Sequence, residues 1–150
     1  MLEAFSKIEN NNWRLLIAGK VEEEYLDELK KINNSDRITF LGYTKSELFF
    51  KNIDVLIVPS LWNEPFGRVV IEGIINKKPV IGSRVGGITE LLTNNDQFLV
   101  EPNLEEFSVI IRNIVSNSNL LDSFVFDEEL LNKVSIERVV RAYIDIFEEI

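Results

Sequence analysis

Short apolar runs that recur along the chain constrain its fold more than any other feature of the sequence. Because strands buried on both faces carry continuous apolar residues, while one-sided antiparallel strands alternate, such runs predict a parallel sheet covered by helices. The runs are Trp13–Ala18, Ile38–Leu41, Val55–Val58, Pro79–Ile81 and, more weakly, Phe98–Val100. The helix-like stretches between and after them are Glu22–Ile32, Lys45–Lys51, Phe66–Asn76, Ile88–Leu92 and Leu104–Val115. This alternation of strand and helix predicts an α/β fold with a doubly wound parallel sheet.

The two ends of the chain depart from this alternation. Leu2, Phe5 and Ile8 lie at helical spacing, so the chain opens in a helix that no strand precedes. Since an α/β unit feeds each helix from a strand, we expect that a strand is missing upstream. At the other end, Ser135 is placed to cap a helix over residues 135–150, whose apolar stripe needs a partner surface. That partner is either the core of this domain or another domain.

Composition and charge exclude several kinds of partner and catalysis. The chain has 150 residues, no cysteine, no histidine and a formal charge of −9, which comes from 16 basic and 25 acidic residues. This length corresponds to one domain over residues 1–150, and the absent residue types leave no disulfide, no imidazole base and no metal site built on them. The acidic balance argues against nucleic acid as a partner. No apolar run approaches the roughly 20 residues of a transmembrane segment. A cytoplasmic location is expected, with peripheral binding to the inner membrane face as an alternative.

A first candidate site follows the apolar run Val55–Val58. Pro65 suits the first turn of a helix, which would place Glu64 at the helix entrance, beside free N–H groups. Gly67 would allow a ligand to approach the backbone closely. Because ligands of open α/β sheets bind beyond the carboxyl ends of the strands, the carboxylates of Glu64 and Glu72 are candidates to accept hydrogen bonds from sugar hydroxyls.

Simpler interpretations of the two glutamates remain open on spacing alone. Glu64 is also a favourable acid at a helix start, and Glu72 is placed to pair with Arg68 at i, i+4 on a solvated face. A glycosidase is a weaker interpretation, because mostly helical chain separates the two backbones by roughly 10–12 Å. The carboxyl groups of hydrolases lie about 5–9.5 Å apart.

Two further segments follow strand ends and are candidates for ligand contact. Gly86 and Gly87 come after the run Pro79–Ile81 and ahead of a short helix, where their N–H groups could cradle a phosphate or a sugar hydroxyl. A plain turn is the commoner explanation for paired glycines. Gly42 and Tyr43 follow another strand, where backbone groups could contact a base. Neither segment is decisive alone.

The order of these motifs along the chain is more specific than any one of them. In sequence they are Leu15-Leu16-Ile17-Ala18-Gly19, Phe40-Leu41-Gly42-Tyr43, Pro59-Ser60, Glu64-Pro65-Phe66-Gly67, Glu72, Pro79-Val80-Ile81, Gly86-Gly87 and Glu90. Over roughly residues 1–117, this pattern resembles the C-terminal, Rossmann-like domain of family 4 glycosyltransferases, which have the GT-B fold. Its most specific part is the pair of glutamates that flank seven residues beginning Pro-Phe-Gly.

The resemblance implies that the domain binds a nucleotide-activated sugar, namely a UDP-, GDP- or ADP-sugar, for retaining transfer to an acceptor hydroxyl. It implies that Glu72 holds the ribose hydroxyls and that Glu64, the catalytic candidate, contacts hydroxyls of the donor sugar. The backbone N–H groups of Phe66 and Gly67 would assist Glu64 in contacting the donor sugar.

The same resemblance implies places for the other two segments. Gly86 and Gly87 would lie near the diphosphate or the sugar, and Gly42 and Tyr43 near the base. No metal and no other cofactor is expected on this domain.

The chain also departs from the family pattern. The family's domain begins with a strand and a loop that carry an Arg and a Lys for the diphosphate; both are absent here, and Arg68 and Arg84 are no obvious substitutes. The N-terminal acceptor domain, which forms the other wall of the cleft, is also absent and would act in cis or in trans. We therefore expect this chain alone to be inactive. We also expect its last helix, around Tyr143 and Phe147, to favour self-association.

Two other functions stay open. The main alternative is a degenerate stand-alone domain that binds a nucleotide or a protein partner without turnover. A sugar epimerase with the GT-B fold is less favoured, because that chemistry also needs groups from both domains. The nucleotide, the sugar and the acceptor are not assigned by the sequence.

Overall fold

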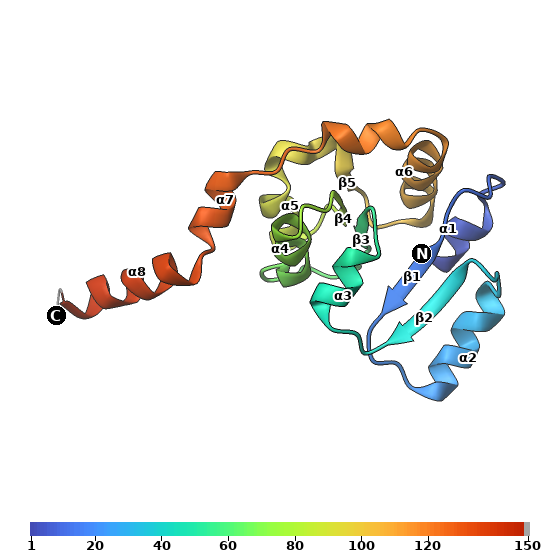
Figure 1. Cartoon of the computed structure of the whole chain (residues 1–150), viewed down its shortest axis with the longest axis horizontal. Coiled ribbons are helices and arrows are strands. Elements are labelled where there is room, and N and C mark those ends of the chain that lie inside the picture. The colour runs from blue at the N-terminus through green and yellow to red at the C-terminus, as the bar shows by residue number, and fades with distance from the viewer. Residues whose placement is uncertain (149–150) are drawn as a thin grey trace.

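The apolar runs form five strands in a computed structural model of the chain, which describes residues 1–148. The strands are β1 (Leu15–Ala18), β2 (Ile38–Gly42), β3 (Leu56–Val58), β4 (Val80–Ser83) and β5 (Leu99–Val100). β1 pairs with β2, while β3, β4 and β5 pair in that order, and every pairing is parallel. The predicted α/β fold with parallel strands is confirmed, although the strands form two sheets and not one continuous sheet (Figure 1).

Helices connect the strands and cover them (Figure 1). They are α1 (Leu2–Ser6), α2 (Glu23–Ile32), α3 (Ser46–Lys51), α4 (Arg68–Ile75), α5 (Gly86–Leu91), α6 (Leu104–Ser116), α7 (Glu128–Lys133) and α8 (Ile136–Glu148), with 3₁₀ turns η1 (Thr93–Phe98) and η2 (Ser118–Ser123). Each helix that the sequence predicts is present close to its expected bounds. The two 3₁₀ turns and α7 are additions that the apolar spacing does not predict.

The start of α4 differs from the prediction. Gly67 is its N-cap and has φ +68° and ψ +46°, a left-handed conformation, so the helix does not extend back through this residue. Pro65 therefore lies ahead of the helix and not in its first turn. For the same reason Glu64 lies on the loop before the helix, while Glu72 is on the helix itself, just over one turn from its start.

The core lies around β4, whose residues are all buried. Side chains from α4 and α5 pack there, including that of Ile88, which is 0% exposed. Gly82 in β4 allows α5 to lie close to the strand, because a Cβ there would stand 2.5 Å from Ile88 Cγ2 and 3.0 Å from Leu92 Cδ1. This close contact positions the first turn of α5, which carries the Gly86–Gly87 segment, relative to the sheet.

The last helix, α8, extends away from the rest of the molecule (Figure 1), whereas α7 packs against the core through Leu130 and Leu131. As predicted, Ser135 caps α8, since the Arg138 N–H donates to Ser135 Oγ at 3.3 Å. Tyr143 and Phe147 on α8 are 63% and 74% exposed. Residues 149–150 of the predicted helix lie outside the described residues. None of the described helices combines the length and the apolar character that crossing a bilayer requires.

Replacing Gly82 with alanine is expected to destabilise the fold by about 1–3 kcal/mol, the range for overpacking a filled core. The added methyl group would displace Ile88 and Leu92, and with them the start of α5. Chemical denaturation followed by circular dichroism measures the change. Lys31→Ala, at an exposed position of α2, is the control and should change stability by less than about 0.5 kcal/mol. A Gly82→Ala protein as stable as the control would contradict this account of the packing.

Candidate functional site

The segments that follow the parallel strands carry the candidate site. Within each sheet the carboxyl ends of the strands lie at one edge, where ligands of α/β proteins bind. Gly42 is the last residue of β2, Pro59 and Ser60 follow β3, and Arg84 follows β4. The predicted site residues therefore lie on these strand ends and loops, or on the helices that the loops enter.

The loop before α4 packs against the first turn of α5, backbone against backbone. The Gly87 N–H donates to the Glu64 carbonyl oxygen at 2.7 Å. A Cβ on Gly86 would stand 2.5 Å from that oxygen, and a Cβ on Gly87 would stand 3.1 Å from Phe66 Cα. Gly86 also has φ +45°, which glycine adopts without strain. The contact depends on both glycines, and it brings together Glu64, Phe66, Gly86 and Gly87.

This contact corrects one predicted role. Gly86 and Gly87 form the first turn of α5 and do not precede it. Because the Gly87 N–H already donates to Glu64, it is not free to bind a phosphate. Gly67 joins the same contact, since a Cβ there would stand 3.1 Å from Leu91 Cδ1. The glycines therefore hold the loop that precedes α4 against α5.

The Glu64 carboxylate is fixed at one of its two oxygens. Ser60, which is 7% exposed, donates through Oγ to Glu64 Oε1 at 3.2 Å. Glu64 itself is half-buried. Within residues 1–148 no second hydrogen bond to this carboxylate is found, so Oε2 is available to accept one from a ligand.

The Glu72 carboxylate also accepts a hydrogen bond from a serine, here an exposed one on a different element. Ser46, at the start of α3, donates through Oγ to Glu72 Oε2 at 2.7 Å. The alternative pairing of Glu72 with Arg68 does not form, since none of the ion pairs in the described part of the chain joins them. Nor does a hydrogen bond link Glu64 to Glu72 there. Each carboxylate has its own serine.

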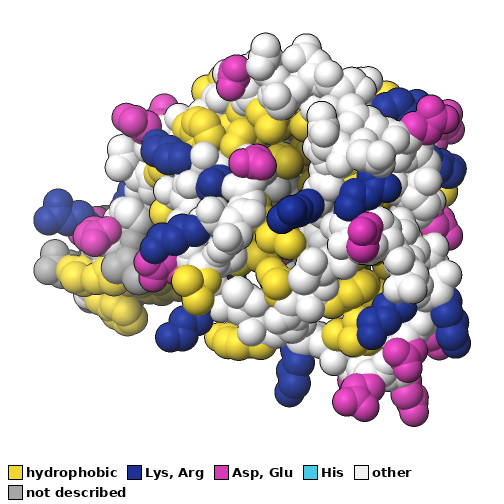
Figure 2. All heavy atoms as spheres, turned by 45° about the vertical axis from the view of Figure 1, so that its right-hand side comes forward, with side chains coloured by type: hydrophobic (Ala, Val, Ile, Leu, Met, Phe, Trp, Pro, Cys, Tyr) yellow, Lys and Arg dark blue, Asp and Glu magenta, His cyan; other side chains and the backbone are white. Residues whose placement is uncertain are grey.

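Exposed aromatic side chains lie on the same strand-end segments. Tyr43 after β2 is 86% exposed, Trp62 after β3 is 64% exposed and Phe66 is 54% exposed. Figure 2 shows that apolar side chains reach the surface in patches between the charged ones on one face of the molecule. No hydrogen bond among the described residues joins the Tyr43 side chain to the other predicted site residues, so Tyr43 is free to contact a ligand.

Arg84 is engaged in ion pairs and is not a free cation for a diphosphate. Its guanidinium lies 2.8 Å from Asp96 Oδ1 and 3.4 Å from Glu101 Oε1, and it donates to the Leu99 carbonyl at 3.5 Å. The hydrogen bond from Arg84 lowers the pKa of the Asp96 carboxyl from its ordinary value, and the same bond raises the pKa of Arg84. The expectation that Arg84 is no obvious substitute for the family's diphosphate cations agrees with this geometry.

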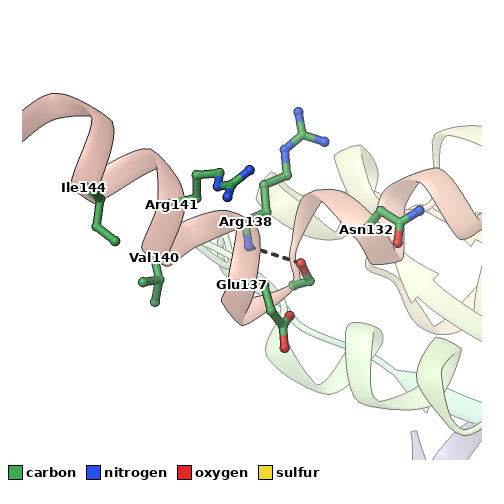
Figure 3. Close-up of a pocket in the computed structure, with 7 residues that line it drawn as sticks. Asn132, Glu137, Arg138, Val140, Arg141 and Ile144 are labelled. Atoms are coloured by element: carbon green, nitrogen blue, oxygen red, sulfur yellow. Dashed lines mark hydrogen bonds between the residues drawn. The ribbon is translucent and has the colours of Figure 1, made fainter. Parts of the chain in front are cut away.

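No metal cluster marks the predicted site in the part of the chain that the structure describes. In the described residues, no group of three or more acidic, histidine or cysteine side chains is placed to hold a metal ion. An open pocket lies instead between α7 and α8 (Figure 3), and it is lined by Asn132, Ser135, Glu137, Arg138, Val140, Arg141 and Ile144. It shares no residue with the predicted site.

Comparison with known proteins identifies the family. Residues 1–126 match the family described as glycosyl transferases group 1. The chain belongs to this family. An uncharacterized glycosyltransferase of Methanocaldococcus jannaschii is 29% identical over 145 residues, which are 93% of this chain and 41% of that protein. The lipopolysaccharide core biosynthesis mannosyltransferase LpsB of Rhizobium meliloti is 28% identical over 94 residues, which are 57% of this chain and 26% of that protein.

Solved glycosyltransferase structures share the fold. A glycosyltransferase from Rickettsia africae has a TM-score of 0.85 at 26% identity, over 99% of this chain and 42% of that one. HepE of Anabaena, solved in complex with UDP and glucose, has a TM-score of 0.83 at 19% identity, over 99% of this chain and 44% of that one. The predicted fold, the C-terminal half of a GT-B glycosyltransferase, is confirmed. This glycosyltransferase chain spans less than half the length of the relatives it matches.

The sequence did not point to the serine that holds Glu72. Ser60 lies inside the predicted motif, four residues before Glu64. Ser46 lies 26 positions from Glu72, and no spacing rule connects the first residue of one helix with the second turn of another. From sequence, a serine beside a helix start is an N-cap candidate. That Ser46 holds the Glu72 carboxylate is seen only in the structure, where the start of α3 meets α4.

The pairing of Arg84 with Asp96 predicts a dependence of stability on pH. Since the pKa of Asp96 is lowered in the folded chain, its contribution is present above the unfolded value of about 3.9 and is lost as the pH falls through the folded value. The free energy of unfolding of the wild type should therefore exceed that of Asp96→Asn near neutral pH, and the difference should vanish in acid.

Denaturation curves across this pH range measure that difference, with Asp36→Asn at an exposed position as the control. High salt should shrink the difference as well, because the pair is exposed. A difference that stays constant from neutral pH into acid would contradict the role of the ion pair.

Proposed function

We propose that this glycosyltransferase domain binds the nucleotide-sugar donor, a UDP-, GDP- or ADP-sugar, as the donor half of an enzyme. The observation that carries the proposal is that two carboxylates each accept a serine hydrogen bond at one oxygen: Glu64 on the loop before α4 from Ser60, and Glu72 on α4 from Ser46. Each keeps its second oxygen for a ligand hydroxyl. The complex of the structurally similar HepE with UDP and glucose supports this class of ligand.

In this proposal the two carboxylates bind different parts of the donor. Glu72 accepts hydrogen bonds from the ribose hydroxyls. Glu64 accepts hydrogen bonds from hydroxyls of the sugar to be transferred, and the backbone N–H groups of Phe66 and Gly67 assist it. A nucleoside diphosphate without its sugar would therefore depend on Glu72 and not on Glu64.

The remaining predicted residues serve the same site in different ways. Gly42 and Tyr43 are proposed to lie beside the base, which the exposure of Tyr43 supports. Gly86 and Gly87 are proposed to lie near the diphosphate or the sugar, where they keep the Glu64 loop in place.

The transfer is proposed to retain the configuration of the anomeric carbon. The bond from that carbon to the diphosphate oxygen breaks, a bond to the acceptor oxygen forms, and the proton of the acceptor hydroxyl passes to the leaving diphosphate. In this proposal the domain contributes to the rate through positioned hydrogen-bond donors and by holding the donor beside the acceptor. Glu64, the catalytic candidate, would fix the sugar beside the acceptor.

This transfer is proposed for a longer protein. The chain spans 22%, 25% and 41% of three of its relatives. Within the described residues β1 pairs with β2 alone and β3 with β4 alone, so each keeps an unpaired edge. We infer that a strand leading into α1 fills the space between these edges, and that an acceptor domain in cis or in trans closes the cleft. The exposed apolar residues of α8 are a surface for that domain or for self-association.

Removing either glutamate should weaken donor binding in a distinct pattern. Glu72→Ala is expected to cost about 1.5–3 kcal/mol in the binding of both UDP and UDP-glucose, the range for hydrogen bonds to a charged group. Glu64→Ala is expected to cost a similar amount for UDP-glucose and nothing for UDP. Calorimetric titration measures both, and the same pair of experiments applies to GDP- and ADP-sugars.

Glu105→Ala is the matched control, because Glu105 is an exposed glutamate in the first turn of α6 and no part of the proposed site. It should bind both ligands as the wild type does. If Glu72→Ala bound both ligands as tightly as this control while its melting temperature fell, Glu72 would be a surface residue that stabilises the fold only.

The isolated chain is expected to release no free nucleotide from a nucleotide sugar in the presence of acceptors. Positioning of the two reactants supplies roughly 7–11 kcal/mol of the barrier, and this domain holds only one of them. A coupled assay with several acceptors measures turnover, with and without the segments proposed to be missing. Sustained transfer by the chain alone would contradict the proposal. Inactivity after those segments are supplied would favour the alternative, a binding domain without turnover.

A further inference from the structure

The Ser46 hydroxyl does not have the usual role of a serine at a helix start. Ser46 is the first residue of α3, Lys45 is the N-cap, and no side chain caps this helix. A serine in this region commonly accepts a hydrogen bond from a backbone N–H of its own helix. Here its hydroxyl donates to the Glu72 carboxylate on α4 instead. The side chain therefore serves Glu72 and not the end of its own helix.

The contact between the two side chains is short and joins distant parts of the sequence. Ser46 Oγ lies 2.7 Å from Glu72 Oε2, within the range for a hydroxyl that donates to a charged oxygen, and the two residues are 26 positions apart. Arg68, one turn before Glu72, forms no ion pair with it in the described part of the chain. A glutamate side chain on a helix rotates about several bonds, so a fixed Oε2 also fixes the direction of Oε1.

The segment that presents Ser46 is itself held in place. Gly42 ends β2 with φ +63°, and Thr44 Oγ1 donates to its carbonyl at 3.5 Å. The Leu48 N–H donates to the Lys45 carbonyl at 3.0 Å. The same segment carries Tyr43, the proposed neighbour of the base. Ser46 thus connects the strand end proposed for the base with the acid proposed for the ribose.

We propose that Ser46 is a positioning residue that holds Oε2 of Glu72 so that Oε1 accepts hydrogen bonds from the ribose hydroxyls. This inference rests on the proposed function of Glu72. Ser46 touches no ligand atom; it reduces the conformational freedom that Glu72 would otherwise lose on binding. Its effect should therefore appear only with ligands that carry ribose hydroxyls.

The test compares a nucleoside diphosphate with its 2′,3′-dideoxy form. The probe is whichever of UDP, GDP and ADP the unmodified chain binds most tightly, and calorimetry measures the affinity of the wild type, Ser46→Ala and Ser46→Thr. Ser46→Ala should weaken binding of the ribose form about three- to tenfold, the range for one net hydrogen bond. Its affinity for the dideoxy form should equal that of the wild type, and Ser46→Thr, which keeps the hydroxyl, should restore binding of the ribose form.

Ser116→Ala, at an exposed position at the end of α6, is the control and should bind both forms as the wild type does. Equal weakening of both forms by Ser46→Ala would show a structural role and would overturn the inference. The inference would also be overturned if Ser46→Ala bound the ribose form as the wild type does while Glu72→Ala bound it more weakly. In that case the proposed function of Glu72 would stand. If Glu72→Ala itself left the ribose form unaffected, the role proposed for Glu72 would fail, and the role of Ser46 with it.

Discussion

The backbone contact between the Glu64 loop and the first turn of α5 is the constraint on which the site depends. The Gly87 N–H donates to the Glu64 carbonyl at 2.7 Å, a Cβ on Gly86 would collide with the loop at 2.5 Å, and a Cβ on Gly87 would crowd it at 3.1 Å. Gly82 has a similar role in the core, because its lack of a side chain lets α5 lie close to β4. Main-chain contacts to α5 therefore set the position of Glu64, and α5 in turn packs against β4.

The alternation of apolar runs and helical stretches predicted the fold well, because buried parallel strands leave a strong compositional signal. Two features escaped this kind of prediction. The start of α4 depends on the left-handed conformation of Gly67, which a glycine permits but does not dictate. The division into two sheets depends on which strand edges meet in space, and runs of residues that are apolar on both faces carry no information about their neighbours.

The family was predictable from the candidate residues, whereas the contacts of these residues were less so. The order of the Glu64, Glu72 and Gly86–Gly87 motifs pointed to the glycosyltransferase family, and the family match bears this out. That Gly87 uses its N–H on a neighbouring loop was not predictable, since paired glycines suit an anion cradle and a close backbone contact equally. Ser46 could not be found at all without the packing of α3 beside α4.

The central claim is that one end of this surface binds the nucleoside and the other the sugar, and amide chemical shifts of the unmodified chain test it most directly. Addition of UDP should shift the signals of Tyr43, Ser46 and Glu72 and leave those of Glu64, Phe66 and Gly67 in place. Addition of UDP-glucose should shift both groups. The division of the donor between Glu72 and Glu64 would be wrong if UDP alone shifted the signals of Glu64, Phe66 and Gly67 as strongly as UDP-glucose does. It would also be wrong if neither ligand shifted those of Tyr43, Ser46 and Glu72.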